Sequence, residues 1–380
     1  VSSIGQQMTE RAEIASARRW VVKVGSALLT DDGRGLDVDV ISALVKQLAQ
    51  LRESGCEVVL VSSGAVAAGI VRLSWDARPQ LIHELQAAAA VGQSALIQSY
   101  ETAFKRYGIA TAQILLVHDD VVARDRYLNA RRTLQTLLNL GVVPIVNEND
   151  TVVTEEIRFG DNDTLAALVA NLIDADVLVL LTDQEGFCEE DPRRNPAAKL
   201  IESCDVDDVR LDDMAGEGGI LGRGGMVTKL RAARLAARSG TETVIASGRV
   251  DNILNSVAAG ANVGTWLKTD KRPHNARKQW LAGMEQPSGR LELDDDAVRV
   301  LIETDSSLLP AGVCSVQGDF ARGDMVSCHD SQGREVARGL VNYSAVETLL
   351  IMGLPSSDIE STLGYRGDEE LIRRDNLVLF

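Results

Sequence analysis

Aromatic residues and histidines are scarce in this sequence. Only 4% of its 380 residues are aromatic, and there are four histidines. The histidines stand apart from one another and form neither a Ser-His-Asp arrangement nor a metal-ligand pattern. The sequence therefore gives no support for a hydrolase triad, and we assign no role to His83, His118, His274 and His329.

Cysteines are also few. The five cysteines are odd in number and scattered, and none forms a Cys-x-x-Cys pair. This pattern suggests neither a zinc site nor a disulfide framework, and it is typical of a protein in a reduced cytoplasm. The residues concerned are Cys56, Cys188, Cys204, Cys314 and Cys328.

Long apolar runs and a positive net charge are absent as well. No run approaches the length of a membrane span, and no signal peptide is visible. The net charge of −16 argues against nucleic acid or an anionic membrane as the main partner. We therefore expect a cytoplasmic protein without a nucleic-acid or membrane partner.

The chain does contain a regular alternation of apolar runs and helical patterns. Strands are predicted at 20–26, 58–61, 111–117, 142–146, 177–181 and 243–246, and helices at 39–53, 83–107, 123–140, 165–173 and 226–239. Such alternation predicts an α/β fold with a mostly parallel sheet that is covered on both faces.

The sequence pattern changes near residue 289, where short apolar runs separated by turn residues begin. These runs, at 291–293, 298–302, 312–316, 325–328 and 335–341, are typical of a small β-rich barrel. We therefore expect a flexible leader at 1–18, a first domain at 19–266, a linker at 267–288, a second domain at 289–370 and a tail at 371–380.

Five predicted strands end in small or polar residues, at 25–26, 62–64, 147–150, 182–183 and 247–248. In α/β sheets ligands bind beyond the carboxyl ends of the strands, so we expect a polar cleft there. Residues 147–164 contain two Asn/Asp clusters. They either hold a ligand or form a turn followed by a helix N-cap, and one of Asp161 and Asp163 is expected to be that cap.

Two lysines and a glycine-rich stretch could bind phosphate. Gly222, Gly224 and Gly225 precede a helical pattern that contains Lys229, and helix N-termini bind anions. The alternative is a flexible surface loop. Neither a Walker P-loop nor a Gly-x-Gly-x-x-Gly motif is present. Lys23 lies inside an apolar strand, where burial is costly unless the side chain points into a polar site; otherwise it is an edge lysine that reaches solvent.

The motifs at 23–26, 61–65, 89–93, 147–150, 159–163, 181–186, 191–193 and 224–229 resemble, in order and spacing, those of the amino acid kinase family, and within it the glutamate 5-kinases. The resemblance covers residues 21 to about 280, and residues 289 to about 367 resemble a PUA domain. It implies a three-layer α/β sandwich followed by a small β-barrel-like domain. It also implies ATP-dependent phosphorylation of the L-glutamate side chain with Mg²⁺, in proline biosynthesis.

The resemblance also implies roles for individual residues, although it assigns no metal ligand. The catalytic residues would be Lys23, Lys229 and Asp163, with Asp163 holding the lysines. The ATP-binding residues would be Lys23, Thr182, Asp183, Arg223, Gly224, Gly225, Met226, Val227, Thr228 and Lys229. The glutamate-binding residues would be Ser63, Gly64, Asn147, Asp150 and Asn162, with Asp150 pairing with the ammonium group.

Some expectations remain open at this stage. The family pattern implies a homo-oligomer that proline inhibits. Two positions depart from it: Ala27 replaces a hydroxyl residue, and Arg223 replaces a threonine and either contacts phosphate or points to solvent. The alternatives are a sister kinase acting on aspartate, N-acetylglutamate or UMP, and an RNA-binding or RNA-modifying PUA protein.

Overall fold

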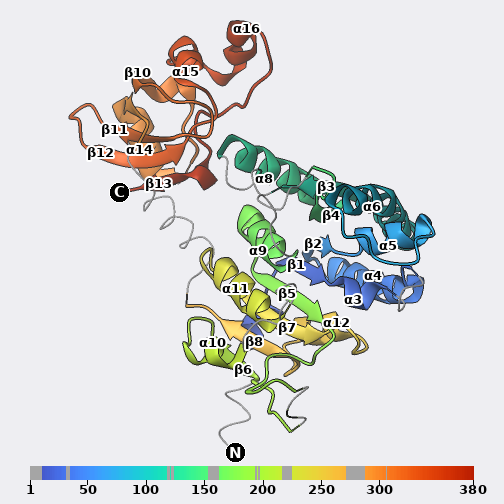
Figure 1. The fold of residues 1–380 in the computed structure, drawn as a ribbon. Coiled ribbons are helices and arrows are strands. Elements are labelled where there is room, and N and C mark those ends of the chain that lie inside the picture. The colour runs from blue at the N-terminus through green and yellow to red at the C-terminus, as the bar shows by residue number, and fades with distance from the viewer. Residues whose placement is uncertain are drawn as a thin grey trace, which may run out of the picture. The chain divides into compact units, whose positions relative to one another are not determined.

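The computed structural model of the chain divides into two units (Figure 1). The first runs to residue 274 except for residues 123–129, which group with residues 275–380 in the second unit. The structure describes residues 11–30, 35–117, 120, 124–152, 162–192, 195, 197–215, 225–270, 287–304 and 306–380. Within these ranges, no helix is both long enough and apolar enough to cross a membrane.

The first unit is built on an eight-stranded sheet with the order β3-β4-β2-β1-β5-β7-β8-β6. Its strands are β1 (Arg19–Val24), β2 (Glu57–Ser62), β3 (Thr111–Leu116), β4 (Val143–Glu148), β5 (Val177–Thr182), β6 (Ser203–Asp205), β7 (Glu242–Ser247) and β8 (Thr265–Lys268). All pairs from β3 to β7 are parallel, and β8 runs antiparallel to β7. The predicted strands and the mostly parallel sheet are confirmed.

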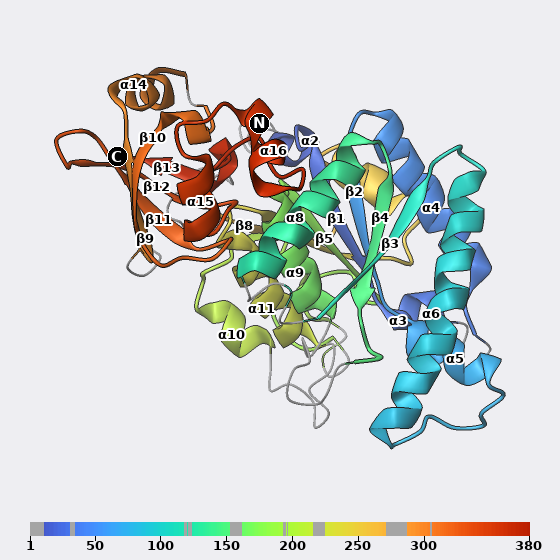
Figure 2. The ribbon, with the colours of Figure 1, turned by 90° about the horizontal axis from the view of Figure 1, so that it is seen from above.

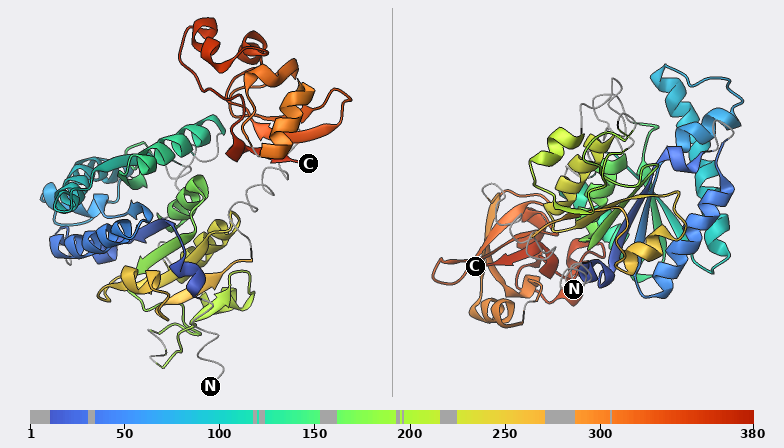
Figure 3. Two further views of the ribbon diagram at one scale, coloured as in Figure 1. Left: turned by 180° about the vertical axis from the view of Figure 1, so that it is seen from behind. Right: turned by 90° about the horizontal axis from the view of Figure 1, so that it is seen from below.

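Helices cover both faces of this sheet (Figure 2 and Figure 3). Those that pack directly against its strands include α4 (Val38–Glu53), α6 (Ile82–Lys105), α9 (Asn162–Ile173), α11 (Met226–Ala237) and α12 (Ile253–Ala258). The other described helices before residue 270 are α2 (Ala12–Ala15), α3 (Ser26–Leu29), α5 (Ala65–Arg72), α8 (Arg124–Asn139) and α10 (Arg210–Ala215). Alternate residues of β1, such as Trp20 and Val22, pack into one core with α4, α6 and α12. Strand periodicity sends Val21 and Lys23 to the opposite face, which α9 and α11 cover.

The helices α5 and α6 touch each other through glycines. A Cβ atom at Gly69 would lie 1.8 Å from the carbonyl oxygen of Ala88, and one at Gly92 would lie 1.8 Å from the carbonyl oxygen of Ala65. Only glycine permits so close an approach between two backbones. The two contacts therefore hold together the two helices that flank the connection at residues 73–81.

The predicted flexible leader is wrong for residues 11–18. Ile14 is buried in the core of the first unit, and Arg11 is 6% exposed. The Arg11 guanidinium donates hydrogen bonds to the carbonyl oxygens of Ala261 (2.7 Å) and Glu202 (2.7 Å). Because these acceptors are about 190 or more positions away, the local sequence gave no sign that the segment is anchored. Residues 1–10 lie outside the described part.

The second unit has a five-stranded sheet with the order β10-β9-β11-β12-β13. Its strands are β9 (Gly289–Leu293), β10 (Val313–Gly318), β11 (Met325–His329), β12 (Glu335–Leu340) and β13 (Leu377–Leu379), and its helices are α14 (Asp295–Thr304), α15 (Ala345–Ile351) and α16 (Ile359–Leu363), with short 3₁₀ turns η1 (Pro310–Gly312), η2 (Ser356–Asp358) and η3 (Arg374–Asn376). The strand β9 pairs in parallel with β11, and the other pairs are antiparallel.

Two predictions for this unit are wrong. The run 298–302 is not a strand but part of α14: Asp294 accepts a hydrogen bond from the backbone N–H of Ala297, Leu301 is buried, and Val300 and Ile302 are exposed. Residues 371–380 are not a tail, because β13 pairs with β12 and Leu371 is buried in the core. In the run 298–302, three of the five residues are β-branched, and this concealed the helical spacing.

Glu242, at the start of β7, is a half-buried carboxyl group with a shifted pKa. Burial raises the pKa of Glu242 to about 7, although hydrogen bonds from Trp266 Nε1 (2.7 Å) and the Thr269 backbone (3.4 Å) act in the opposite direction. The folded protein thus keeps a proton on Glu242 that the unfolded chain has already released. The protein is therefore expected to lose stability as the pH rises from about 4.5 to about 7.

Replacing Glu242 by glutamine removes this titration. The free energy of unfolding of Glu242→Gln should equal that of the unaltered protein near pH 4 and exceed it by on the order of 2 kcal/mol near pH 8. Urea unfolding at the two pH values measures this. Glu53→Gln, at an exposed position of α4, is the control that should show no such gain. An equal difference at both pH values would contradict the expected titration.

Candidate active site

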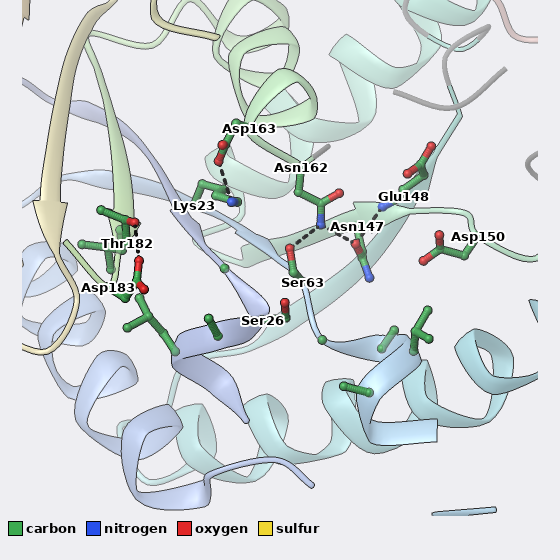
Figure 4. A pocket seen from close by; sticks show the side chains of 18 of the residues that line it. Lys23, Ser26, Ser63, Asn147, Glu148, Asp150, Asn162, Asp163, Thr182 and Asp183 are labelled. Atoms are coloured by element: carbon green, nitrogen blue, oxygen red, sulfur yellow. Dashed lines mark hydrogen bonds and ion pairs between the residues drawn. The ribbon is translucent and has the colours of Figure 1, made fainter. Parts of the chain in front are cut away.

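A cleft lies where the carboxyl ends of the central strands β4, β2, β1 and β5 meet. Its volume is about 400 Å³. Four of the five predicted strand ends line it. The predicted site residues that line it are Lys23, Ser63, Gly64, Asn147, Asp150, Asn162, Asp163, Thr182, Asp183 and Lys229. All of them except Gly64 and Lys229 are labelled in Figure 4.

The predicted fifth end, residues 247–248, does not line the cleft. A Cβ atom at Gly248 would lie 2.5 Å from Leu28 Cδ1 and 3.4 Å from Leu181 Cβ. Gly248 thus packs beneath Leu28 and Leu181, which line the cleft themselves. The end of β7 supports the cleft wall and takes no part in its surface.

Two lysines share one buried carboxylate in this cleft. Lys23 Nζ lies 2.5 Å from Asp163 Oδ1, and Lys229 Nζ lies 2.9 Å from Asp163 Oδ2. Asp163 is fully buried, and the two lysines are 6% and 4% exposed. The three residues come from β1, α9 and α11, so three separate elements must assemble to form this cluster.

The electrostatics of the cluster favour the ionised carboxylate. Burial alone would raise the pKa of Asp163, but the ammonium groups of Lys23 and Lys229 together hold it below its ordinary value. The hydroxyl of Thr228 also lies 3.0 Å from Oδ2, and it shares its one proton between this oxygen and the carbonyl of Gly225 at 2.8 Å. The cluster therefore carries two positive charges against one negative charge, which suits it to bind an anionic group.

The helices α9 and α11 both begin beside this cluster. Asn162 and Asp163 belong to the first turn of α9, and Lys229 lies in the first turn of α11. The N-terminal ends of helices carry partial positive charge and unpaired N–H groups, which add to the attraction for an anion.

The glycine-rich stretch is only partly described. Arg223 and Gly224, together with Asp161, lie outside the described residues. Gly225 precedes α11 as its N-cap residue, and Met226, Val227 and Thr228 follow it in the first turn. Among the described residues 225–229 only Lys229 lines the cleft, so nucleotide contacts of residues 223–228 remain predictions.

A network of amides holds one end of the cleft. Asn162 Nδ2 lies 2.9 Å from Ser63 Oγ and 2.9 Å from Asn147 Oδ1, to which it donates. Asn147 Nδ2 in turn donates to Gln93 Oε1 at 2.8 Å. The network joins β2, β4, α6 and α9, and it fixes the orientation of the two asparagines on the cleft wall (Figure 4).

Gly64 occupies a special backbone position at this end. It precedes α5 with φ of 106°, a left-handed conformation that a side chain would strain. Asp150 and the buried Glu148 line the same end of the cleft, on the far side of Asn147 from Lys23 (Figure 4). This end therefore offers carboxylates, amides and a backbone N–H group.

The opposite end of the cleft is formed by the end of β5. Thr182 Oγ1 donates a hydrogen bond to Asp183 Oδ1 at 3.1 Å, and both residues line the cleft. Figure 4 shows Lys23 and Asp163 between this pair and the amide network. The lysine cluster thus lies between two polar ends, an arrangement that can bring two ligands together at a shared anionic group.

Sequence reasoning did not assign a role in the cleft to Gln93 or Arg78. Gln93 lies among the buried positions Ala89, Gly92 and Leu96 of α6, and a glutamine at such a position signals a polar contact in the core. Arg78 lines the cleft from the 73–81 connection, and the sequence offers no periodic signal that could place it there.

Comparison with known proteins agrees with the geometry. The sequence profile of the amino acid kinase family matches residues 18–247, and that of the PUA domain matches residues 289–363. The glutamate 5-kinase of Saccharophagus degradans is 61% identical over 372 residues, covering 98% of this chain and 100% of that protein. The glutamate 5-kinase of Pseudomonas aeruginosa is 60% identical over 370 residues, covering 97% and 100% respectively. The chain therefore belongs to the amino acid kinase family, among its glutamate 5-kinases, and carries a PUA domain after the kinase domain.

Proposed function

We propose that this protein transfers the γ-phosphoryl group of ATP to the side-chain carboxylate of L-glutamate. The product is L-glutamyl 5-phosphate, the first intermediate of proline biosynthesis. The observation that carries the proposal is the Lys23–Asp163–Lys229 cluster between two polar ends of one cleft. Relatives named glutamate 5-kinase, about 60% identical over nearly the whole chain, support the choice of glutamate.

The chemistry of this reaction agrees with the residues present. The acceptor carboxylate is already ionised near neutral pH, so one of its oxygens attacks the γ-phosphorus without a general base. A bond forms from that oxygen to phosphorus, and the bond from phosphorus to the β–γ bridging oxygen breaks to release ADP. Such a transfer needs positioning and positive charge. Lys23 and Lys229 would supply that charge, and no histidine is among the described residues that line the cleft.

The two ends of the cleft would divide the substrates between them. Thr182 and Asp183, with the start of α11, would hold the nucleotide. Ser63, Asn147, Asp150 and Asn162 would hold glutamate, and the N–H group of Gly64 would face its reacting carboxylate. The ammonium group of glutamate would pair with Asp150.

Magnesium would enter this site together with ATP. Among the described residues no three His, Cys, Asp or Glu side chains gather into a metal site. That fits Mg²⁺, which is usually held by one or two carboxylates and the phosphates of the nucleotide. Asp163 is occupied by the lysines, so Asp183 at the nucleotide end would be the carboxylate placed to contact the ion. When bound, Mg²⁺ would neutralise charge on the phosphate oxygens.

An acyl-phosphate assay tests the proposed function. The protein is mixed with ATP, Mg²⁺, hydroxylamine and L-glutamate, and we expect a hydroxamate that requires all components. Aspartate and N-acetylglutamate serve as matched acceptors, and ADP release is followed with UMP. A product from one of these acceptors with none from glutamate would assign the protein to a sister kinase.

The remaining parts of the proposal rest on the family resemblance. They are a kinase domain at 19–266, a PUA domain from residue 289, assembly into a homo-oligomer, feedback inhibition by proline, and a cytoplasmic location. An RNA-binding function is less favoured, because residues 290–380 contain 17 Asp and Glu, 8 Arg and no Lys, a net charge of −9. RNA recognition needs a basic surface.

A further inference from the structure

The cationic side chains of the cleft differ in whether they form an ion pair within the protein. Among the described residues that line it, the cationic side chains are Lys23, Lys229 and Arg78. Both lysines are ion-paired with Asp163. Arg78 is exposed, and among the described residues no ion pair or hydrogen bond of its guanidinium is found. Arg78 is therefore the cation of the cleft that remains available to a ligand.

The proposed acceptor carries more charge than the assigned residues neutralise. L-Glutamate has two carboxylates and one ammonium group. The side-chain carboxylate is to lie beside Lys23, and the ammonium group is to pair with Asp150, so the α-carboxylate has no assigned partner. Placing a carboxylate beside Glu148 and Asp150 without a cation would be unfavourable.

We propose that Arg78 binds the α-carboxylate of the acceptor and so selects an α-amino dicarboxylate over an amino acid that lacks this group. The planar guanidinium can donate two parallel hydrogen bonds to a carboxylate, which a lysine cannot do. The inference rests on the proposed function and names the group that completes its acceptor site.

The fold gives Arg78 a defined place. It lies in the connection 73–81, between α5, which begins at the cleft with Ala65, and α6, which contributes Leu85 and Gln86 to the cleft wall. The glycine contacts of α5 with α6, at Gly69 and Gly92, hold together the two helices that flank the connection. Arg78 is thus carried on the same hairpin as the acceptor end of the site.

The test compares two acceptors that differ only in the α-carboxylate. L-Glutamate and 4-aminobutyrate share the reacting carboxylate, the chain length and the amino group. We expect Arg78→Met to lower kcat/KM for glutamate roughly 10- to 100-fold, mainly through KM, as suits the loss of one charged hydrogen-bonding partner. The variant should leave KM for ATP unchanged. It should also leave kcat/KM for 4-aminobutyrate unchanged. Where turnover of 4-aminobutyrate is too slow to measure, its inhibition constant as a competitor of glutamate should be unchanged instead.

Two further variants sharpen the result. Arg78→Lys keeps the charge without the planar fork and should restore part of the loss for glutamate alone. Arg72→Met removes an exposed arginine of α5 that does not line the cleft, and it should behave as the unaltered protein. An Arg78→Met variant that affects both acceptors equally, or neither, would overturn the role of Arg78. No product from glutamate with the unaltered protein would overturn the proposed function itself.

Discussion

Asp163→Asn is expected to remove most of the phosphoryl transfer and to destabilise the protein. The change leaves Lys23 and Lys229, both almost fully buried, beside a neutral amide. Removing one partner of a buried ion pair typically costs roughly 3–5 kcal/mol. Because the lysines also lose their fixed positions, we expect kcat to fall about 10²- to 10³-fold, as for the loss of one preorganised charged group. Urea unfolding and the hydroxamate assay measure the two effects.

The pH dependence and a double variant separate charge from packing. The lysines hold the pKa of Asp163 below its ordinary value. The ionised Asp163 therefore stabilises the folded protein at neutral pH, and this contribution is lost as the pH falls through that lowered pKa. The deficit of Asp163→Asn should thus be constant at neutral pH and shrink in acid. Asp163→Asn combined with Lys229→Met removes one excess ammonium group and should regain stability but not activity. A double variant that is less stable than the single one would contradict this electrostatic account.

Gly92→Ala is expected to lower the free energy of unfolding by about 3 kcal/mol, the upper end of the usual cost of overpacking. The added Cβ atom would lie 1.8 Å from the carbonyl oxygen of Ala65 and 2.4 Å from the backbone nitrogen of Gly69. These are backbone atoms, so α5 has to move as a whole. The higher helix propensity of alanine returns only about 1 kcal/mol.

The same movement should be visible in the kinetics. Ala65 and Gly64 line the end of the cleft that is proposed to hold glutamate, so displacement of α5 should raise KM for glutamate more than KM for ATP. Gly225→Ala is the matched control for unfolding, because its Cβ atom would meet nothing within 4 Å. If Gly92→Ala proved as stable as Gly225→Ala, the contact between α5 and α6 would be softer than the geometry indicates.

The central sheet could be predicted from the sequence because its strands are continuous apolar runs that end in polar residues. Lys23 could be predicted as a site residue because a lysine inside such an apolar run is costly to bury unless its side chain reaches a polar site. The prediction failed where the local pattern was ambiguous, as at 298–302, where β-branched residues occupy a helix.

Contacts between distant segments could not be predicted in this way. Arg11 binds carbonyl groups about 190 or more residues away, and the pairing of Gln93 with Asn147 spans 54 positions. Nothing in the local sequence encodes such partners. The location of Arg78 on the cleft has the same origin, because it depends on how α5 and α6 pack rather than on the sequence around it.

The division of the cleft among different elements has an evolutionary consequence. The Lys23–Asp163–Lys229 cluster lies on β1, α9 and α11, whereas Arg78 lies on the surface connection between α5 and α6. Surface connections tolerate substitution and changes of length far better than the core does. Substitutions at residues 73–81 in a gene duplicate could therefore change the preference among related acceptors, while the Lys23–Asp163–Lys229 cluster stays intact.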